Sequence, residues 1–494
     1  MNYILGIDQG TSGTKALLFD EMGKAVAKGS EPLTTFYLAN GHVEQDPDSI
    51  VENVLTAVGK CLDAFVRSGG RFDEIRACGI SNQRETFVLW DAAGKPLYNA
   101  VVWQCKRSVD ICGRWRAAGY SDLIRSRTGL LIDPYFSGSK LVWLYENNTV
   151  VRGAIDAGEA FFGTVDTWLL YRLTGGASYS TDYTNASRTL FFDLKELHWD
   201  RELLEVFGLS RLRLPQPRSS SEAFGHTDFN GLLPQPIPIT GMIGDSHAAA
   251  FGEGCFCPGE AKATLGTGCS ILMNTGPVCM ESRNGMVSTI CSSTADTVHY
   301  ALEGVIVTCG ATLEWLKNEL GLFTDSRHTE EMAGAVKDNG GVYLVPAFSG
   351  LGAPHWQMDR KASISGLTFG SSRNHIVRAA LESIAFQIKD VIVAMEADTA
   401  LPLTKIMVDG GISANTFVTQ FLADLLEKEV VTIGLPDISA LGAAYMSGLS
   451  AGVYPSIAHL RLLNTEKMTR VPTPGNKTAG YYKGWLEALT SRTT

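Results

Sequence analysis

The chain opens with Ile4-Leu5-Gly6-Ile7-Asp8-Gln9-Gly10-Thr11-Ser12-Gly13-Thr14-Lys15, an apolar run that leads into a turn rich in Gly and Thr, and a second apolar run follows from Ala16 to Phe19. Glycines let a backbone approach an anion closely, and the N–H groups and hydroxyls of such a turn can donate hydrogen bonds to phosphate oxygens. Asp8 places a carboxylate at the mouth of the turn, where a phosphate-bound Mg²⁺ ion would need oxygen ligands. The stretch therefore predicts a β-hairpin that binds phosphate.

A shorter version of this pattern occurs about halfway along the chain. Thr264-Leu265-Gly266-Thr267-Gly268-Cys269-Ser270 again joins two apolar runs through a Gly–Thr turn. Two such turns, one in each half, predict a single nucleotide held between two related domains. The pair indicates an ATP-dependent protein that arose by internal duplication.

Composition limits the class of protein. At 494 residues the chain is too long for one core, so two or three domains are expected. The net charge of −10 argues against a nucleic-acid or anionic-membrane partner, because both require clustered cations. No stretch reaches the ~18 apolar residues of a membrane span, and the N-terminus lacks the pattern of a secretion signal. We therefore expect a cytoplasmic protein without membrane insertion.

Strand-like and helix-like runs alternate from end to end, which indicates α/β architecture. The expected strands are residues 3–7, 15–19, 25–28, 75–80, 261–264, 270–274 and 297–302. The expected helices are residues 49–68, 313–320, 374–397 and 415–428. A Pro/Ser-rich stretch, Pro215 to Pro238, predicts a surface connection ahead of a boundary near Gly244 to Gly254. The expected domains are residues 1–250 and 251–494.

Several common cofactor signatures are absent from the sequence. It contains no GxxxxGK[ST] loop, no GxGxxG that opens a helix after a strand, and no protein-kinase HRD or DFG motif. Its ten cysteines include no CxxC pair, which favours free thiols over a zinc site. These absences argue against a P-loop enzyme or a dehydrogenase. Nucleotide binding must then rest on the Gly–Thr turns.

One carboxylate, Asp245, stands among small residues in the segment Ile243-Gly244-Asp245-Ser246-His247-Ala248-Ala249-Ala250, at the end of an apolar stretch. Phosphoryl transfer to an alcohol needs a base that accepts the proton of the attacking hydroxyl, and Asp245 suits that role. Two other interpretations stay open. Asp245 could cap the helix that follows, and Ser246 with His247 could form a nucleophile–base pair.

A polar group, Ser81 to Thr86, follows directly after an expected strand. Open α/β sheets bind ligands at strand ends, and Arg84 with Glu85 could bind the hydroxyls of a polyol. Trp103 and Tyr135 add aromatic faces that suit the C–H surface of such a ligand. The alternatives are a solvated turn with a local ion pair, and ordinary core packing for each aromatic side chain.

Several long blocks resemble the FGGY carbohydrate kinases, within the actin/Hsp70/sugar-kinase superfamily, and most closely its glycerol kinases. The blocks are Asn82–Thr86, Val102–Cys105, Asp133–Asn147, Phe162–Trp168, Thr181–Arg188, Gly366-Leu367 and His375–Glu382. A strand–Gly-Gly–helix stretch from Met407 to Asn415 adds to them, and the resemblance reaches about Val453. It implies two actin-like (ribonuclease H-like) domains, each with a mixed five-stranded sheet, that close on ATP·Mg²⁺ and a small polyol or sugar.

The resemblance also implies roles for residues of this sequence. Asp245 would be the catalytic base. The polyol pocket would consist of Arg84, Glu85, Trp103, Tyr135, Asp245, Ser246 and Ser270. The nucleotide would contact Thr11, Ser12, Gly13, Lys15, Gly266, Thr267, Gly310, Glu314, Gly411 and Asn415, and Asp8 would hold Mg²⁺ through water. The protein would assemble as a homodimer or homotetramer.

The sequence departs from glycerol kinases inside the expected pocket. Ser246 replaces a Gln that reaches a substrate hydroxyl, and Ser270 replaces a Phe that packs on the glycerol carbons. Both changes shrink the side chain and make the pocket more polar, so that it could take a longer substrate. Glu314 likewise stands where a Gln near the adenine is usual. The expected reaction is phosphorylation of glycerol to sn-glycerol 3-phosphate, or of a four- or five-carbon polyol or ketose such as erythritol, a pentitol, xylulose or ribulose.

Two other classes of function are weighed against a kinase. A non-metabolic actin-like ATPase would not need Arg84, Glu85, Trp103 and Tyr135 beside a base. A non-catalytic sugar sensor would be expected to lose Asp245, which is present. The sequence therefore favours the kinase.

Overall fold

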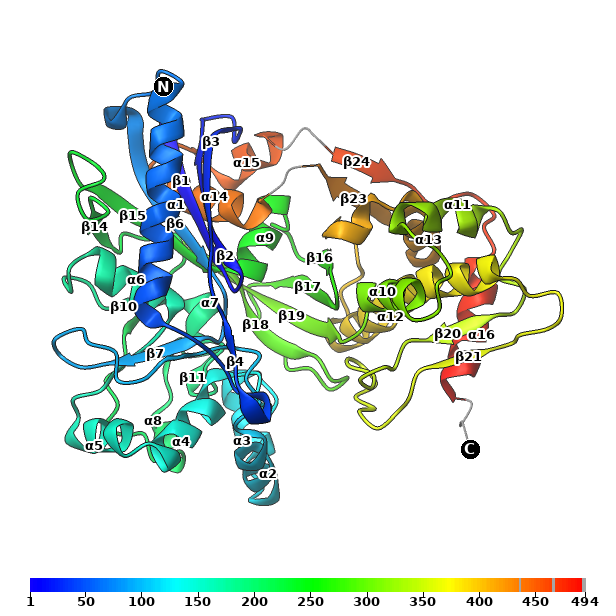
Figure 1. The fold of residues 1–494 in the computed structure, drawn as a ribbon, viewed down its shortest axis with the longest axis horizontal. Helices are drawn as coiled ribbons and strands as arrows, with labels where there is room; N and C mark the ends of the chain where they lie inside the picture. Colours follow the sequence, from blue (N-terminus) through cyan, green and yellow to red (C-terminus); the bar gives the residue numbers. More distant parts are fainter. Residues whose placement is uncertain (435–436, 464–466, 491–494) are drawn as a thin grey trace.

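The protein has two lobes, each built on a mixed β-sheet, as Figure 1 shows for the computed structural model. The structure describes residues 1–434, 437–463 and 467–490. Helices and strands alternate along these residues, which confirms the expected α/β architecture. Within the same ranges, no helix combines the length and the apolar character needed to cross a bilayer.

The first lobe contains a six-stranded sheet in the order β14-β15-β6-β1-β2-β3. Its strands are β1 (Tyr3–Gly10), β2 (Gly13–Phe19), β3 (Ala25–Pro32), β6 (Ile75–Asn82), β14 (Gly225–Thr227) and β15 (Ile237–Gly244). β1 and β2 form the expected hairpin, and their register sets Asp8 opposite Lys15. β6 runs parallel to both β1 and β15, so that Gln9, Asn82 and Gly244 are neighbours at one edge. This edge brings together the first Gly–Thr turn, the polar group after β6 and Asp245.

The second lobe repeats this topology. Its sheet has the order β18-β19-β17-β16-β22-β23-β24. The strands are β16 (Glu260–Leu265), β17 (Cys269–Gly276), β18 (Val287–Ser293), β19 (Val298–Ile306), β22 (Lys405–Asp409), β23 (Glu429–Ile433) and β24 (Lys467–Arg470). In both sheets a hairpin pairs with an antiparallel strand on one side and with two parallel strands on the other. The internal duplication is therefore visible in the strand order.

Each sheet is larger than the five strands that the family resemblance implies. The antiparallel edge strands β14 and β24 extend the two sheets, and β18 adds a further strand to the second. The stretch Pro215 to Pro238 is also more than a surface connection, because it contains β13 (Gln216–Arg218) and β14. The Pro-rich pattern concealed these short edge strands, which tolerate proline better than central strands do.

Helices α1 (Pro47–Arg67) and α14 (Ile438–Ser450) cover the first sheet. α1 begins after Asp46, whose side chain accepts a hydrogen bond from the Asp48 N–H. α14 lies so close to the sheet that a Cβ on Gly6 or Gly79 would stand 2.4 or 2.0 Å from a carbonyl oxygen of the helix. Since backbone would have to move to make room, these positions require glycine.

Helix α9 (Asp245–Glu253) connects β15 of the first sheet to β16 of the second, and the domain boundary expected near it stays a prediction. α14 packs along it, and a Cβ on Gly442 would lie 1.8 Å from the Ala248 carbonyl oxygen. Although α14 lies in sequence between β23 and β24 of the second sheet, it packs on the first. α9 is thereby fixed between α14 and the strand that precedes Asp245.

An insertion in the first lobe carries a third sheet, ordered β4-β5-β8-β7-β9, and most of the helices of that lobe. Its strands are β4 (Phe36–Tyr37), β5 (Val43–Gln45), β7 (Phe87–Trp90), β8 (Ala100–Val101) and β9 (Phe161–Thr164). The helices are α2 (Val109–Ala117), α3 (Ser121–Thr128), α4 (Ser137–Asn147), α5 (Thr149–Ala157), α6 (Val165–Leu173), α7 (Tyr183–Ala186) and α8 (Arg201–Val206). Short strands β10 (Ser180–Asp182), β11 (Phe192–Asp193) and β12 (His198–Trp199) connect them.

Helices α10 (Gly310–Asn318), α12 (Arg373–Thr399) and α13 (Thr416–Leu426) of the second lobe confirm three helices expected from periodicity. The remaining elements are α11 (Thr329–Gly334), α15 (Ile457–Leu463), α16 (Thr478–Thr490), β20 (Tyr343–Val345) and β21 (Ser363–Ser365). The core between α12, α13 and the second sheet supports the second Gly–Thr turn from behind.

Candidate active site

Asp245 is the first residue of α9, directly after the end of β15, and its side chain is 40% exposed. The N-cap residue is Gly244, so Asp245 occupies the first position inside the helix. Its Oδ1 accepts a 2.6 Å hydrogen bond from the next backbone N–H and lies 3.3 Å from Arg84 Nε. Asp245 is therefore not the N-cap residue of α9, and its carboxylate is accessible beside a buried cation.

Ser246 and His247 point to different partners. The Ser246 hydroxyl lies 3.2 Å from Lys262 Nζ, whereas His247 Nε2 lies 3.3 Å from Thr289 Oγ1 on β18. Burial, with a further contribution from Arg84, lowers the pKa of His247 well below its usual value, so the ring is neutral. These two residues do not form the nucleophile–base pair that the sequence left open.

A buried network of two arginines and two glutamates joins the lobes beside Asp245. Arg84 Nη2 donates a 2.8 Å hydrogen bond to Oε1 of Glu303 on β19, and Arg188 Nη1 lies 2.8 Å from Glu303 Oε2. Arg188 Nε also donates to Glu85 Oε1 at 2.6 Å. Each of the four side chains is at most 6% exposed. Burial alone would raise the pKa of Glu303, but the two arginines outweigh it and lower that pKa far below its usual value.

The sequence pointed to Arg84 and Glu85 but gave no role to Arg188 or Glu303. Arg188 ends one of the blocks that carried the family resemblance, which was the available signal. Glu303 lies inside a strand and is 219 residues from Arg84, so no local pattern marks it. Ser270 Oγ donates to the same carboxylate at 3.2 Å, which links the second Gly–Thr turn to the network.

The residues around this network show two unusual features, a left-handed backbone and buried polar atoms without partners. Glu85 has a φ of 60°, a left-handed conformation that a residue with a side chain rarely adopts. Its carbonyl accepts a 2.7 Å hydrogen bond from Ser137 Oγ. Among the described residues, Arg84 Nη1 and His247 Nδ1 are buried without a hydrogen-bond partner. Buried polar atoms are nearly always paired, so these two favour a polar ligand beside this network.

Trp103 and Tyr135 form an aromatic pair beside the network, with ring centroids 5.7 Å apart and an angle of 70°. Trp103 Nε1 donates a 2.9 Å hydrogen bond to Thr11 Oγ1 in the first turn. Thr11 in turn donates to Gln83 Oε1 at 3.2 Å. The structure thus brings the predicted aromatic residues to the first Gly–Thr turn.

Within the first turn, a Cβ on Gly13 would stand 2.4 Å from the Glu31 carbonyl oxygen of β3. Ser12 is exposed and its carbonyl accepts from the Leu33 N–H at 2.9 Å. The turn is therefore tight and fixed by β3. Its exposed hydroxyl and backbone are available to an anion.

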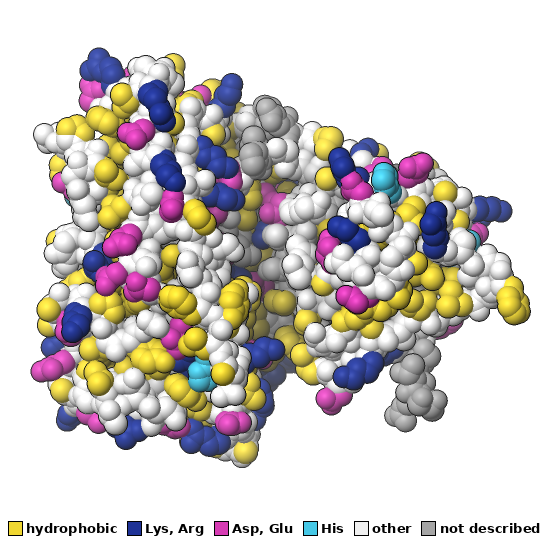
Figure 2. Space-filling view, viewed as in Figure 1, with side chains coloured by type: hydrophobic (Ala, Val, Ile, Leu, Met, Phe, Trp, Pro, Cys, Tyr) yellow, Lys and Arg dark blue, Asp and Glu magenta, His cyan; other side chains and the backbone are white. Residues whose placement is uncertain are grey.

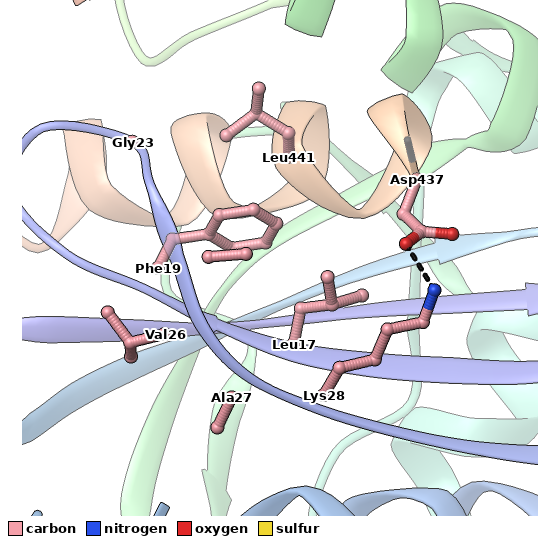
Figure 3. A pocket seen from close by; sticks show the side chains of 9 residues that line it. Leu17, Phe19, Gly23, Val26, Ala27, Lys28, Asp437 and Leu441 are labelled. Atoms are coloured by element: carbon pink, nitrogen blue, oxygen red, sulfur yellow. Dashed lines mark hydrogen bonds and ion pairs between the residues drawn. The ribbon is translucent and has the colours of Figure 1, made fainter. Parts of the chain in front are cut away.

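The Lys15 side chain is engaged by a carboxylate of the C-terminal half, because it forms a 2.9 Å ion pair with Asp437. Lys28 pairs with the same carboxylate at 2.5 Å, and Figure 3 shows this second pair. Beside it, β2, β3 and α14 line an apolar pocket of about 300 Å³ that contains none of the predicted site residues. Lys15 as a phosphate ligand stays a prediction, and it would have to leave Asp437.

Asp8 is the residue available for Mg²⁺ at the first turn. Its carboxylate accepts a 3.2 Å hydrogen bond from Ser81 Oγ. Burial, with a smaller contribution from nearby Asp245, raises the pKa of Asp8 to about 6. Two neighbouring carboxylates form a hard oxygen donor set, which is what Mg²⁺ prefers. The residues present therefore fit the ion.

The second turn is packed against the start of α10. The Gly310 N–H donates to the Gly266 carbonyl at 2.9 Å, and the Cys309 N–H donates to the Thr267 carbonyl at 2.8 Å. A Cβ on Gly310 would lie 3.0 Å from Ile412 Cδ1, beside the Gly-Gly turn. Three of the predicted nucleotide residues thus lie together.

The other residues predicted to bind adenosine lie in three different environments. A Cβ on Gly411 would meet no atom within 4 Å, so its backbone faces open space. Asn415 caps α13 through its Oδ1, and its Nδ2 donates to Thr329 Oγ1 at 3.1 Å. Glu314 lies on α10, where its side chain is exposed and its Oε2 accepts from Asn318 at 3.5 Å. Its contact with adenine stays a prediction.

A hollow separates the two lobes in Figure 2. A duplicated fold of this kind, with a Gly–Thr turn in each half, defines the class: a two-domain protein with actin-like architecture. Residues 3–252 match the FGGY family of carbohydrate kinases, N-terminal domain, and residues 261–451 match its C-terminal domain. The chain belongs to this family.

Known relatives agree with this assignment over the whole length. A glycerol kinase of Fusobacterium nucleatum is 44% identical over 99% of this chain and 98% of its own. Glycerol kinase 2 of Thermotoga maritima is also 44% identical, with the same coverage. The crystal structure of Plasmodium falciparum glycerol kinase with ADP matches with a TM-score of 0.93 and 35% identity, over 99% of this chain and 98% of that one. A Lactobacillus acidophilus xylulose kinase, 23% identical with a TM-score of 0.88 over 99% and 97%, has the same fold.

Replacing Glu303 by Gln leaves two buried guanidiniums without their shared carboxylate. We expect Glu303→Gln to lower the free energy of unfolding by about 3–5 kcal/mol and kcat/KM for the polyol by about 10²-fold. Urea denaturation and steady-state kinetics measure both. Glu146→Gln is the matched control, because Glu146 pairs with Arg114 at the surface. Equal effects of the two substitutions would contradict a role for Glu303 in joining the lobes.

Proposed function

We propose that the protein phosphorylates a terminal hydroxyl of glycerol with ATP, to give sn-glycerol 3-phosphate. The observation that carries the proposal is the accessible Asp245 carboxylate, held 3.3 Å from Arg84 Nε at the edge where three parallel strands end. The two glycerol kinases named above, 44% identical over nearly the full chain, support glycerol as the acceptor.

In this proposal Asp245 accepts the proton of the attacking hydroxyl as the bond to the γ-phosphorus forms. Arg84 orients the carboxylate and, with Glu85, binds the remaining hydroxyls. Trp103 and Tyr135 cover the C–H surface of the polyol. The side chains of Ser246 and Ser270 complete the pocket from α9 and from the second turn. Contacts with the arginine–glutamate network support the roles of Asp245, Tyr135 and Ser270.

The nucleotide would span the two turns. Its phosphates would contact Thr11, Ser12, Gly13 and Lys15 on one side and Gly266 and Thr267 on the other. Gly310, Glu314, Gly411 and Asn415 would surround the adenosine. Asp8 would hold Mg²⁺ through water, and the ion would neutralise phosphate charge.

Closure of the lobes would exclude water, which otherwise competes with the polyol as acceptor. The proposed domains are residues 1–250 and 251–494, with α14 reaching back to the first sheet. Assembly of two or four copies and a cytoplasmic location stay predictions.

The proposal is tested with Asp245→Asn, which keeps the shape of the side chain and removes the base. We expect transfer to polyol to fall by about 10³-fold, while calorimetry shows nearly unchanged ATP binding. Asp296→Asn, at an exposed position, should behave as the parent enzyme does. The parent should release ADP only with a polyol present. Retained transfer in Asp245→Asn would refute the mechanism, and polyol-independent ADP release would favour an ATPase.

A second candidate, a four- or five-carbon polyol or ketose, is supported by Ser246 and Ser270. Both hydroxyls make polar contacts: that of Ser246 with Lys262, and that of Ser270 with Glu303. A pocket lined in this way could bind one more hydroxyl than glycerol has.

The two acceptors are distinguished by kcat/KM across glycerol, erythritol, the pentitols and the pentuloses. If the polar pocket determines the substrate, a longer acceptor exceeds glycerol, and Ser270→Phe lowers its kcat/KM by about tenfold or more while sparing glycerol. The highest kcat/KM for glycerol would eliminate the second candidate.

A further inference from the structure

Lys140, on α4, is a buried cation whose role neither the sequence nor the family resemblance addressed. Its side chain is completely buried. Among the described residues it forms no ion pair with a carboxylate within 4.0 Å. A charged side chain is costly to bury unless hydrogen bonds satisfy it, so its partners indicate why it is there.

Within the part of the chain that the structure describes, Lys140 Nζ has three hydrogen-bond partners, and all are backbone carbonyls. They belong to Tyr135 at 2.6 Å, Pro134 at 2.9 Å and Trp103 at 3.4 Å. An ammonium group has three donors, which matches the three acceptors. One buried group thus connects two segments that are 32 residues apart in sequence, 103 and 135.

Both segments lie outside regular structure and carry the aromatic side chains of the polyol pocket. Trp103 follows β8, and Tyr135 precedes α4. The angle between the two rings depends on where these backbones lie. Nearby side chains hold the two rings, since Trp103 Nε1 donates to Thr11 and the Arg188 guanidinium lies 5.9 Å from the Tyr135 ring centroid. Lys140 holds the backbone from which the rings project.

We propose that Lys140 is a positioning residue for substrate recognition: by binding the carbonyls of residues 103, 134 and 135 it sets the aromatic wall of the polyol pocket. The inference rests on the proposed function, because it takes these aromatic side chains to contact the polyol. Lys140 itself touches neither substrate nor nucleotide.

Electrostatics agree with this geometry. Burial lowers the pKa of Lys140 to about 8, although Glu85, Cys105, Asp133 and Cys112, which face it, act in the opposite direction. Below pH 8 the group carries three protons for three carbonyls. Above pH 8 it loses one of them, and one carbonyl is left without a donor.

The test uses Lys140→Met, which keeps the unbranched stem of the side chain and removes the ammonium donors. We expect KM for the polyol to rise about ten- to hundredfold, with kcat and KM for ATP changed less than about threefold. Lys389→Met is the matched control, because Lys389 Nζ also donates to a carbonyl, that of Leu425, but in the second lobe. A fall in kcat without a change in KM, or a parallel loss of ATP binding, would overturn the proposal.

A double-mutant cycle separates positioning from a general structural role. If Lys140 acts through Trp103, the effect of Lys140→Met on KM should largely disappear in a Trp103→Ala background. Additive effects would overturn the proposal. Since Asp245→Asn tests phosphoryl transfer itself, a failed cycle with intact transfer leaves the proposed function standing.

The parent enzyme provides a test that needs no folded Lys140 variant. KM for the polyol should rise between pH 7 and pH 9 with an apparent pKa near 8, while KM for ATP stays level. Cys105→Ser and Cys112→Ser should keep this pH dependence, which assigns it to the lysine rather than to the thiols that face it. A level KM for the polyol across this range would overturn the proposal.

Discussion

The Glu303 carboxylate is the constraint on which the site depends. It comes from a strand of the second lobe and is bound by Arg84 and Arg188 of the first, so the two lobes meet at one buried, charge-balanced point. Removing any member of such a group leaves an unpaired buried charge, which is far more costly than losing a surface ion pair. Arg84 also contacts Asp245, and Ser270 contacts Glu303. The orientation of the base, the polyol pocket and the second phosphate turn therefore share one anchor.

Close backbone packing supports this anchor from behind. α14 lies against β1, β6 and α9 where glycines leave room for its carbonyl groups. Because α14 lies in sequence between two strands of the second sheet but packs on the first, it connects the two halves at a second place besides the ion network. α9, whose first residue is Asp245, is held between these two attachments. The carboxylate that we propose as the base thus lies at the start of a short helix that is held at both ends.

Local patterns in the sequence predicted the parts of the site that are encoded locally. The two Gly–Thr hairpins, the strand that ends before Asp245, the polar group after β6 and the start of α13 all depend on residues close together in the chain. Arg188, Glu303 and Lys140 escaped prediction because their partners lie far away or are backbone groups, which leave no periodic trace. The same reason explains why the ion pair between Lys15 and Asp437 was not predicted, since the two residues come from opposite ends of the chain. Short edge strands such as β14 were hidden by a Pro-rich composition that resembles a linker.

The central claim is that Asp245 lets the polyol attack the γ-phosphate of ATP directly, with no phosphorylated residue on the way. The stereochemistry at phosphorus tests this claim most directly. ATP made chiral at the γ-phosphorus with oxygen isotopes would be converted with the preferred polyol, and the configuration of the phosphorylated product determined. A single in-line transfer predicts inversion. Retention would mean two successive transfers through a residue of the protein, and would contradict direct attack by the polyol.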